Sequence, residues 1–552
     1  MMLSAYPYPR FEYRRPPELS EPEVHRHPVI VVGAGPIGIA AAIDCRLKGL
    51  PVVLLDDDDT VSVGSRGLCY AKRSLEVLDR LGCGERVVRK GVSWNVGRTF
   101  FRDEEVYHFN LAPQPGHKRP GMLNLQQYYL EEFELARARE LGVDLRWRNR
   151  VASVSCAPDH VKLEVETPEG TYAIEAEWLI AADGAGSPIR KMLRLEVDGH
   201  AFQDRFLIAD IAMKAEFPPE RWFWFDPPFH RHQSVLLHRQ ADNVWRIDFQ
   251  LGSDADPELE KRPENVRRRV RAMLGDEREF ELTWVSVYSF QCRRLRNFRH
   301  GRILFVGDAA HQVSPFGARG ANSGYQDVDN LGWKLQFVMA GQAPETLLDS
   351  YSDERTFAAD ENILNSTRST DFISPKTAIS KVFRDAVLEL AQQHAFARRL
   401  VNSGRLSVPT VYTDSALNTE DVDTFAGSMV PGAPMEDGPL AGGGWLIDEL
   451  GGQFQLLVFA DDPAMLDSQL PAAFEALAAG RVPTQSLILA RRAGKVRGAR
   501  TLIDATGIVT SRYDAAPGTV YLARPDQHVA ARWRRMDLAR VRSALARATC
   551  HG

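Results

Sequence analysis

Cysteine is scarce in this sequence, and the few cysteines are not paired. Six are spread over 552 residues, with no C-x-x-C among them. Zinc sites and disulfide frameworks both need cysteines at close or regular spacing, so neither is expected. We therefore predict a protein of the reducing cytoplasm that holds no metal.

Long apolar runs are missing as well. A membrane helix needs about 18 or more apolar residues in succession, and charges such as Arg46, Lys48 and Lys334 interrupt every candidate. The first 27 residues, rich in Pro, Arg, Tyr and Glu, lack the apolar centre of a signal peptide. We expect a soluble protein that begins with an irregular arm.

No excess of charge points to a polyanionic partner. The formal net charge is -5, and 44% hydrophobic with 26% charged residues is typical of ordinary globular proteins. Neither nucleic acid nor a membrane is therefore expected as a partner. The length allows about three or four domains of roughly 150 residues each.

What the sequence does contain is a nucleotide-binding pattern near its N-terminus. A short β-branched run, Val29 to Val32, is followed at once by G-x-G-x-x-G, whose glycines are Gly33, Gly35 and Gly38. In a dinucleotide fold the first glycine allows the turn, the second lets backbone approach a pyrophosphate, and the third lets the helix lie close to the strand. A second strand ends at Asp56, whose carboxylate can accept the hydroxyls of an adenosine ribose.

Two later segments also lead from a strand through a glycine turn into a helix. Leu179 to Ala182 runs into Asp183-Gly184, and a helix with Arg190 in its first turn follows. Ile303 to Val306 runs into Gly307-Asp308, and a loop rich in Pro and Gly then leads to a helix predicted to begin near Ser323. Helix N-termini favour anions, and Asp308 can accept a hydroxyl of a sugar-like chain.

Between these segments the pattern changes to that of an antiparallel sheet. From about Phe202 to Arg294 aromatic and polar residues alternate, which is typical of strands with one wet face. We expect this sheet to roof a ligand pocket, with inward aromatic, His and Arg side chains as substrate contacts. Helices are predicted from Ala343 to about Arg405, and a separate small α/β domain from Trp445 to His551.

The three segments in this order resemble the single-component flavin-dependent aromatic hydroxylases, the p-hydroxybenzoate hydroxylase-like class. The resemblance rests on G-x-G-x-x-G, on D-G with the following Arg, and on G-D-A-A-H with the later P-x-G-x-x-G-x-N-x-G and D-x-x-N-L-x-W-K-L. The tail resembles the thioredoxin-like domain of the branch containing phenol 2-monooxygenase and 3-(3-hydroxyphenyl)propionate hydroxylase.

The resemblance implies an α/β fold with a Rossmann-type FAD-binding domain, an inserted antiparallel-sheet substrate domain and a thioredoxin-like C-terminal domain. The implied boundaries are an arm at 1–27, the FAD-binding domain at 28–200 and, with its helices, 295–408, the substrate sheet at 201–294, a linker at 409–444 and the C-terminal domain at 445–552.

Non-covalent FAD is the implied cofactor, and NADH or NADPH the co-substrate. Carried over by position, the FAD contacts are Gly33, Gly35, Pro36, Ile37, Gly38, Asp56, Asp57, Arg66, Gln127, Asp183, Gly307, Asp308, Pro315, Gly320, Ala321 and Asn322. Two departures stand out, because the tail lacks C-x-x-C and the loop reads Ala318-Arg319-Gly320-Ala321 where many relatives have Gly-Gln-Gly-Leu. No second Rossmann motif distinguishes NADH from NADPH.

The implied reaction is hydroxylation of a phenolic or amino-substituted aromatic compound, with an aromatic acid favoured, through addition of O2 at carbon 4a of the flavin. Favouring the phenolate of a phenol with a pKa of about 10 needs a positioned base or cation. The predicted catalytic residues are Arg246, His230, Tyr288 and Pro315, with His232 and His238 as further candidates for the base. Trp222, Trp224 and Trp245 are candidate faces for the ring, and a homodimer is a candidate assembly.

Two other functions fit part of the sequence. Trp222 to Pro227 half-matches the W-x-W-x-I-P of flavin-dependent halogenases, although Asp226 breaks the match. The second alternative is a flavoprotein that binds or senses redox state without turnover. NAD(P)H oxidation that depends on an aromatic ligand would separate these possibilities.

Overall fold

The structure is a computed structural model, and it describes residues 6–21, 23–111, 115–252, 254–275, 278–401 and 406–551. The described residues form a mixed α/β fold with four sheets, in agreement with the expected fold class. Among the helices of these residues, none is both long and apolar enough to cross a lipid bilayer.

The first sheet carries the nucleotide-binding pattern. Val29 pairs in parallel with Val52 on one side and with Trp178 on the other, so the strand lies in the middle of the sheet. Strands buried on both faces read as unbroken apolar runs, which explains the sequences VIVV and VVLL. In sheet order its main strands are β17 (Arg299–His300), β18 (Ile303–Phe305), β11 (Gly170–Ala181), β1 (His25–Val32), β2 (Val52–Leu55) and β8 (Asp144–Arg146).

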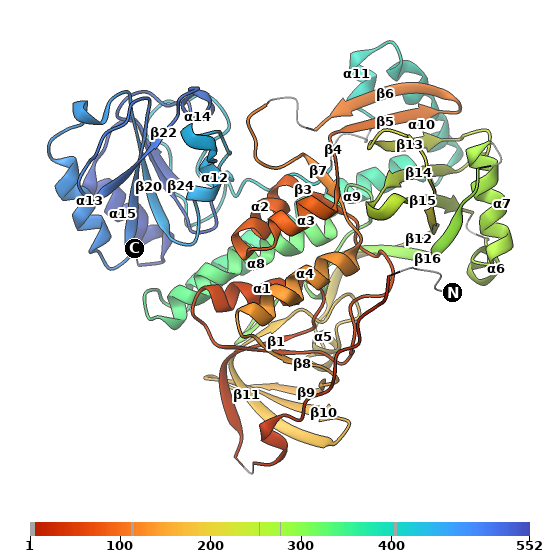
Figure 1. Cartoon of the computed structure of the whole chain (residues 1–552), viewed down its shortest axis with the longest axis horizontal. Helices are drawn as coiled ribbons and strands as arrows, with labels where there is room; N and C mark the ends of the chain where they lie inside the picture. Colours follow the sequence, from red (N-terminus) through yellow and green to blue (C-terminus); the bar gives the residue numbers. More distant parts are fainter. Residues whose placement is uncertain are drawn as a thin grey trace.

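A layer of helices lies against this sheet, and an antiparallel ribbon extends from it (Figure 1). The helices are α1 (Pro36–Leu47), α4 (Gln127–Glu140) and α8 (Gly320–Met339), and the ribbon is β9 (Arg150–Cys156) with β10 (Val161–Thr167). Nearby, the short strands β3 (Cys69–Ala71), β7 (Met122–Asn124) and β4 (Val92–Trp94) form a third sheet beside α2 (Lys72–Leu81) and α3 (Gly84–Lys90).

The second sheet is the predicted antiparallel one, and it extends beyond residues 201–294. In sheet order it contains β19 (His311–Gln312), β16 (Glu281–Leu295), β12 (Val197–Ala212), β15 (Val244–Leu251), β14 (Ser234–Arg239), β13 (Arg221–Phe225), β5 (Val96–Phe101) and β6 (Glu104–Asn110). The strands β5 and β6 come from the first part of the chain, and β5 joins in parallel to β13. We call this eight-stranded sheet the substrate sheet.

The two faces of the substrate sheet pack against different helices. One face packs against α7 (Pro263–Leu274), where Ile247 and Phe249 of β15 share a core with Val266. The short α6 (Pro257–Glu260) precedes α7. The other face, which we call the inner face, packs against the end of α9 (Leu347–Ile373) and against α10 (Ala378–Ala391), which precedes the short α11 (Ala395–Arg398). The short α5 (Pro188–Met192) leads from β11 into β12.

The C-terminal domain contains the last sheet, in the order β22-β21-β20-β23-β24. A parallel β-α-β unit is followed by an antiparallel hairpin and a terminal helix, which is the thioredoxin-like arrangement expected. Its elements are α12 (Leu446–Glu449), β20 (Phe454–Ala460), α13 (Leu470–Ala478), β21 (Thr484–Ala490), β22 (Ala499–Ile503), α14 (Ile508–Arg512), β23 (Val520–Ala523), β24 (Val529–Trp533) and α15 (Leu538–Ala548). A pocket of about 1120 Å³ opens beside α13, and no cysteine lines it among the described residues.

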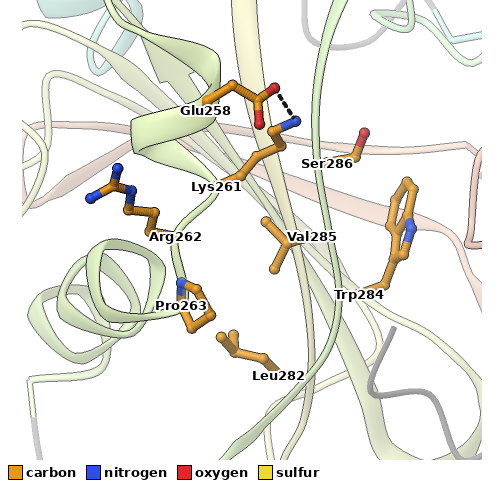
Figure 2. Close-up of a pocket in the computed structure, with 8 residues that line it drawn as sticks. All are labelled: Glu258, Lys261, Arg262, Pro263, Leu282, Trp284, Val285 and Ser286. Atoms are coloured by element: carbon orange, nitrogen blue, oxygen red, sulfur yellow. Dashed lines mark hydrogen bonds and ion pairs between the residues drawn. The ribbon is translucent and has the colours of Figure 1, made fainter. Parts of the chain in front are cut away.

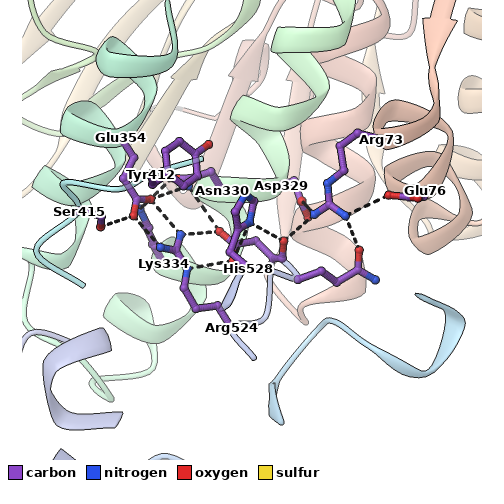
Figure 3. A network of polar contacts seen from close by, with 12 residues as sticks. Arg73, Glu76, Asp329, Asn330, Lys334, Glu354, Tyr412, Ser415, Arg524 and His528 are labelled. Atoms are coloured by element: carbon purple, nitrogen blue, oxygen red, sulfur yellow. Dashed lines mark hydrogen bonds and ion pairs between the residues drawn. The ribbon is translucent and has the colours of Figure 1, made fainter. Parts of the chain in front are cut away.

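A buried ionic cluster joins this domain to the rest of the chain (Figure 3). Glu354 of α9 accepts hydrogen bonds from Lys334 of α8 at 2.7 Å and from Arg524, which follows β23, at 2.6 and 2.9 Å. Burial lowers the pKa of Lys334 to about 8. Burial alone would raise the pKa of Glu354, but Arg524 and Lys334 hold it well below its usual range. Asp526 pairs with Arg524 at 2.6 Å and completes the cluster.

The predicted linker at 409–444 is packed against the protein. Tyr412 is buried and accepts a hydrogen bond of 2.7 Å from Arg355 of α9, while Met429, Met435 and Leu440 enter the core of the C-terminal domain. Proline and glycine therefore mark an ordered irregular connection here.

Candidate flavin and substrate site

The three strand-turn segments meet at the carboxyl ends of their strands. Gly33 has φ +104°, and a Cβ built on it would lie 2.4 Å from the carbonyl oxygen of Ala182, at the end of β11. A Cβ on Gly307 would lie 3.3 Å from the side chain of Ile37 in α1. Glycine is therefore required at Gly33, where the first segment contacts the second. The third segment contacts the first through Ile37.

The N-terminus of α1 suits the pyrophosphate of FAD. Gly35 is its N-cap and Pro36 its first residue, so no side chain caps the unpaired N–H groups of the first turn. No atom lies within 4 Å of a Cβ built on Gly35, which leaves open space in front of these donors. Free donors beside open space are what an anion needs at a helix N-terminus, so these residues fit the cofactor.

Asp56 shapes the glycine turn. Its carboxylate accepts hydrogen bonds from the N–H groups of Ala34 and, at 2.8 Å, of Asp58. Burial raises the pKa of Asp56 to about 6, and the backbone hydrogen bonds oppose this rise. Asp57 beside it is exposed. The predicted ribose contact Asp56 and the predicted FAD contact Asp57 therefore both lie just after β2, where Asp56 bonds the glycine turn.

Asp308 and Asp183 have different surroundings. Asp308 is exposed, yet desolvation by the surrounding protein raises its pKa, a combination that places the carboxylate in a recess. Asp183 instead accepts hydrogen bonds from Ile189 N–H at 2.9 Å and from the Ser187 hydroxyl at 2.7 Å. Asp183 therefore holds the first turn of α5, whereas Asp308 keeps its carboxylate available to a ligand.

Gln127 supports the loop that carries Arg66. Its amide oxygen accepts a hydrogen bond of 2.7 Å from Gly67 N–H, and its amide nitrogen donates to Ser62 at 3.1 Å and to Glu131 at 2.8 Å. Arg66 itself is exposed. Of the two predicted FAD contacts, only Arg66 has a side chain open to solvent. Gln127 instead holds residues 62–67 in place, and we call this segment the flavin loop.

The first turn of α8 is tied to β3. The helix begins at Gly320, three residues earlier than predicted, because the turn after Ala318 already has helical geometry. Buried Asn322 accepts a hydrogen bond of 2.8 Å from Ala71 N–H and donates one of 2.9 Å to the Cys69 carbonyl. The amide of Asn322 is thus used in holding α8 to β3. Of the other predicted contacts here, Pro315 is exposed, and Gly320 and Ala321 are half-buried.

One residue that sequence reasoning missed holds the third segment in place. Asp327 is fully buried and accepts hydrogen bonds from Gly307 N–H at 2.9 Å, His311 at 2.7 Å and Arg355 at 2.6 Å. Burial would raise its pKa, but His311 and Arg355 hold the pKa of Asp327 below its usual value. The signal was present in G-D-A-A-H and D-x-x-N-L, where His311 and Asp327 belong to the quoted motifs.

Arg246 connects the inner face of the substrate sheet to the flavin loop. It is buried, forms an ion pair of 3.0 Å with Asp210 and donates a hydrogen bond to the backbone carbonyl of Ser65. Its guanidinium also lies 5.6 Å from the ring centre of Trp284. Arg246 is therefore committed to protein partners on the side where the flavin loop approaches the sheet.

Several polar groups on the inner face are buried without partners. Strand register places Arg246, Asp248 and His238 on this face, and Tyr288 of β16 joins them. Asp248 Oδ1 and His238 Nδ1 have no hydrogen-bond partner among the described residues. Burial raises the pKa of Asp248 to about 7 and lowers the pKa of His238 well below its usual value.

Arg221 of β13 adds a cation to the same face. It is buried, and within the described part of the chain its guanidinium has no hydrogen-bond acceptor. Burial lowers its pKa to about 10, although Cys69 and Asp248 oppose this. Asp248 and Arg221 were absent from the sequence prediction. Alternation in VWRIDF would have placed Asp248 beside Arg246, since residues two apart share a face.

Other predicted substrate residues do not lie on this face. His230 donates a hydrogen bond of 2.7 Å from Nε2 to the Gln250 carbonyl, and its ring packs against Phe249 on the side of α7. His232 is exposed. Trp222, Trp224 and Trp245 also pack on the α7 side, so the suggestion that they receive a substrate ring beside Arg246 is wrong.

A small pocket lies at the free edge of β16 (Figure 2). It has a volume of about 330 Å³ and is lined by Trp284 and Ser286 of the strand and by Lys261 and Arg262 of the α6–α7 corner. A Cβ built on Gly64 would lie 2.2 Å from the Trp284 ring. The indole is therefore a wall between this outer pocket and the flavin loop.

Residues 26–366 match the family described as FAD binding domain. The chain belongs to this family. The 6-methylpretetramide 4-monooxygenase of Streptomyces rimosus is 30% identical over 75% of this chain and 74% of its own length. The 3-(3-hydroxy-phenyl)propionate/3-hydroxycinnamic acid hydroxylase of Mycobacterium sp. (strain JLS) is 28% identical over 91% of this chain and 88% of its own.

Solved structures agree with the fold across nearly the whole chain. The flavin-dependent monooxygenase PieE, in complex with FAD and substrate, superposes with a TM-score of 0.79 at 22% identity, covering 96% of this chain and all of that one. Aklavinone-11 hydroxylase with FAD and aklavinone gives 0.76 at 23% identity, again over 96% and 100%. The relatives are monooxygenases and hydroxylases, which favours hydroxylation over the halogenase alternative.

Proposed function

We propose that this chain hydroxylates a ring activated by a hydroxyl or amino group, using FAD, NAD(P)H and O2. The observation that carries the proposal is the inner face of the substrate sheet. It lies against the flavin loop through Arg246, buries Asp248 Oδ1 and His238 Nδ1 without hydrogen-bond partners among the described residues, and also carries the buried Arg221. Buried polar groups are costly when unpaired, so a ligand with hydroxyl and carbonyl or carboxylate groups would stabilise them.

The cofactor is proposed to lie across the three strand-turn segments. The N-terminus of α1 would hold the pyrophosphate, Asp56 the adenosine ribose and Asp308 the ribityl chain, while Arg66 would contact FAD from the flavin loop. The chemistry that bound FAD supplies is acceptance of hydride from NAD(P)H and activation of O2, with one oxygen atom entering the ring and the other leaving as water. The chain itself must bind the ring, orient it and exclude water.

An aromatic acid remains the favoured substrate, but Arg221 replaces Arg246 as the residue proposed to bind its acid group. Arg246 is occupied by Asp210 and Ser65, so it is a poor partner for a substrate carboxylate. Arg221 is a buried cation on the same face, and its guanidinium lies 5.5 Å from the ring centre of Phe223 and forms no ion pair with a described residue. We propose that Arg221 binds a carboxylate or carbonyl oxygen of the substrate, which agrees with the name of the relative that hydroxylates 3-(3-hydroxy-phenyl)propionate.

A screen of hydroxylated benzoates and phenylpropionates would test the function. The purified protein should oxidise NADH or NADPH faster with the right phenol, and mass spectrometry and NMR should show one added oxygen ortho or para to the hydroxyl. Oxidation that yields only hydrogen peroxide with every phenol, or chlorine incorporation with chloride present, would contradict the proposal.

The free cysteines support a proposed location, and an exposed apolar stripe supports a proposed assembly. All six cysteines are free, which agrees with the reducing cytoplasm we propose as its location. Helix α10 exposes Ile379, Val382 and Phe383 by 82%, 69% and 58%, so this apolar stripe is the proposed contact of a homodimer. Light scattering of the wild type and of Phe383→Ser would test the dimer, which should dissociate in the variant.

A further inference from the structure

We infer that Asp248 accepts the hydrogen of the substrate's ring hydroxyl and serves as the catalytic base that draws the ring toward its phenolate. The inference rests on the proposed function and assigns a residue to the step that raises the electron density of the ring. Asp248 is only 8% exposed, and its Oδ1 has no hydrogen-bond partner among the described residues.

The position of Asp248 on the sheet supports this role. It lies two residues after Arg246, so both side chains project from the inner face of β15, where Arg246 reaches the flavin loop. A ring held against Asp248 would therefore lie on the flavin side of the sheet. His230, one of the bases expected from sequence, packs on the other face and cannot compete for this role.

The titratable groups around Asp248 lie on its own strand and on four others. Arg246 on its own strand and Arg221 on β13 lower its pKa, while Asp210 on β12 raises it. Burial raises the pKa of Tyr288 on β16 and of Cys69 on β3, and the negative charge of Asp248 raises both pKa values further. Since both stay neutral near pH 7, neither competes with Asp248 as a base in that range.

His238 is a weaker candidate for the same step. It lies on the inner face opposite Arg246, but burial together with Arg221 and Arg246 lowers its pKa well below the usual value. A base whose conjugate acid is disfavoured in this way has little affinity for a phenolic proton. His238 can still accept a hydrogen bond, whereas Asp248 can take the proton.

The step balances in atoms and charge. The phenolic O–H bond breaks, its proton moves to Asp248 Oδ1, and the electron pair stays on the ring oxygen, so a carboxylate and a phenol become a carboxylic acid and a phenolate. With a phenol pKa of about 10 and an Asp248 pKa of about 7, the transfer is unfavourable by a factor of about 1000 before cations act. The positive charges of Arg221 and Arg246 offset part of this at the ring oxygen through the low dielectric of the buried site, while Arg246 keeps its contacts with Asp210 and Ser65.

The pH dependence has a defined sign. Only the ionised carboxylate can accept the proton, so kcat/KM should rise as the pH increases through about 7, the pKa of Asp248 in the free protein. Asp248→Asn removes this rising limb. It should also lower kcat by about 100- to 10,000-fold, the usual contribution of a general base, while FAD binding is unchanged.

Two readouts separate a chemical role from a structural one. Phenols made more acidic by fluorine should recover part of the lost rate in Asp248→Asn, because they need less help from a base. Binding of 3-(3-hydroxyphenyl)propionate and of its methyl ether, measured by calorimetry on the FAD-loaded protein without NAD(P)H, gives the second readout. The wild type should prefer the phenol at least tenfold, and Asp248→Leu should abolish that preference, since the ether leaves the carboxylate unpaired.

The control is Glu216→Gln, which changes an exposed carboxylate in the loop before β13 and should leave rate, pH profile and preference unchanged. If the wild type forms product and Asp248→Asn keeps its rate and rising limb, the inference is overturned while the function stands. If the wild type prefers the phenol but no phenol gives an oxygenated product, the proposed function fails while the hydroxyl contact stands. Equal binding of phenol and ether to the wild type also overturns the inference.

Discussion

Arg190 donates a hydrogen bond of 2.9 Å from Nη1 to the backbone carbonyl of Ala309, which lies 119 positions later in the chain. The same guanidinium donates to the carbonyl of Ala185 at 2.7 Å. One buried side chain therefore connects the turn after β11 to the turn after β18. Because Asp308 immediately precedes Ala309, the position of its carboxylate depends on Arg190 as well as on its own strand.

Removing the Asp308 carboxylate should weaken FAD binding. The carboxylate is a charged acceptor in a desolvating recess, and such a hydrogen bond contributes roughly 1.5 to 3 kcal/mol, equivalent to about 10- to 150-fold in Kd. Asp308→Ala should show this loss when apoprotein is titrated with FAD and flavin fluorescence is followed. Asp103→Ala, in the turn between β5 and β6, is the control. Full flavin occupancy at unchanged affinity would refute the assignment.

FAD should be released when the purified protein is denatured with acid. No His or Cys of the sequence stands at a position that matches a flavin-linking site, so the cofactor is expected to bind without a covalent bond. The supernatant after acid precipitation should contain all of the yellow colour, and the pellet should be colourless. A yellow pellet would show that the bond is covalent.

Gly64→Ala should disturb the flavin loop more than a matched glycine change elsewhere. Gly64 and Gly49 have φ of +79° and +77°, so alanine at either position costs about 1 to 2 kcal/mol in backbone strain. Only at Gly64 would the new Cβ meet Trp284, at 2.2 Å, whereas nothing lies within 4 Å at Gly49. Overpacking should add about 1 to 3 kcal/mol to the loss of unfolding free energy.

Denaturant unfolding and FAD titration of both variants would measure this difference. Trp284→Ala in the Gly64→Ala background should restore part of the lost stability, because it removes the clash. Equal losses for Gly64→Ala and Gly49→Ala would mean that Trp284 does not pack against the flavin loop as described.

Breaking the ionic cluster should destabilise the whole chain. Arg524→Met leaves Glu354 and Asp526 buried with one cation fewer, and loss of one partner in a buried pair costs about 3 to 5 kcal/mol. The loss should shrink when Glu354→Gln is added, since the uncompensated charge is then removed. Additive losses in the double variant, measured by urea unfolding, would show that the two charges are not coupled.

Cys550→Ser should leave turnover unchanged. The C-terminal domain has no C-x-x-C, and Cys550 packs beside its core at the end of α15. Burial raises the pKa of its thiol, which disfavours the reactive thiolate. Steady-state NAD(P)H oxidation with the best phenol is the measurement, and a large loss of rate in this variant would show that the domain has thiol chemistry.

The parts of the fold that could be predicted from sequence depend on local patterns. The glycine turn at Gly33, the alternating strands of the substrate sheet and the β-α-β unit of the tail each leave a periodic signal over a few residues. The start of α8 was predicted three residues late because Gly320 and Asn322 are poor helix formers, and tertiary bonds from Asn322 to Cys69 and Ala71 override this preference.

The parts that could not be predicted depend on contacts between distant segments. Gln127 was expected at the cofactor, but its amide meets Gly67 and Ser62, which no spacing rule connects to it. Asp248 was overlooked because an Asp in a strand is ordinarily assigned to the wet face, and only strand register shows that this face is buried. Proline and glycine at 409–444 suggested a linker, although packing of Tyr412 against α9 decides its structure.

The ionic cluster also sets the order in which this protein can mature on the ribosome. Helix α8 carries Gly320 at one end and Lys334 near the other, yet the Arg524 and Asp526 that complete the cluster are synthesised 170 to 192 residues after Glu354 and Lys334. Until they emerge, a nascent chain holds Lys334 and Glu354 without their full set of counter-charges, so we expect α8 to reach its final packing only after Arg524 is made. Loading of FAD should therefore be a post-translational event, even though the first glycine motif leaves the ribosome early.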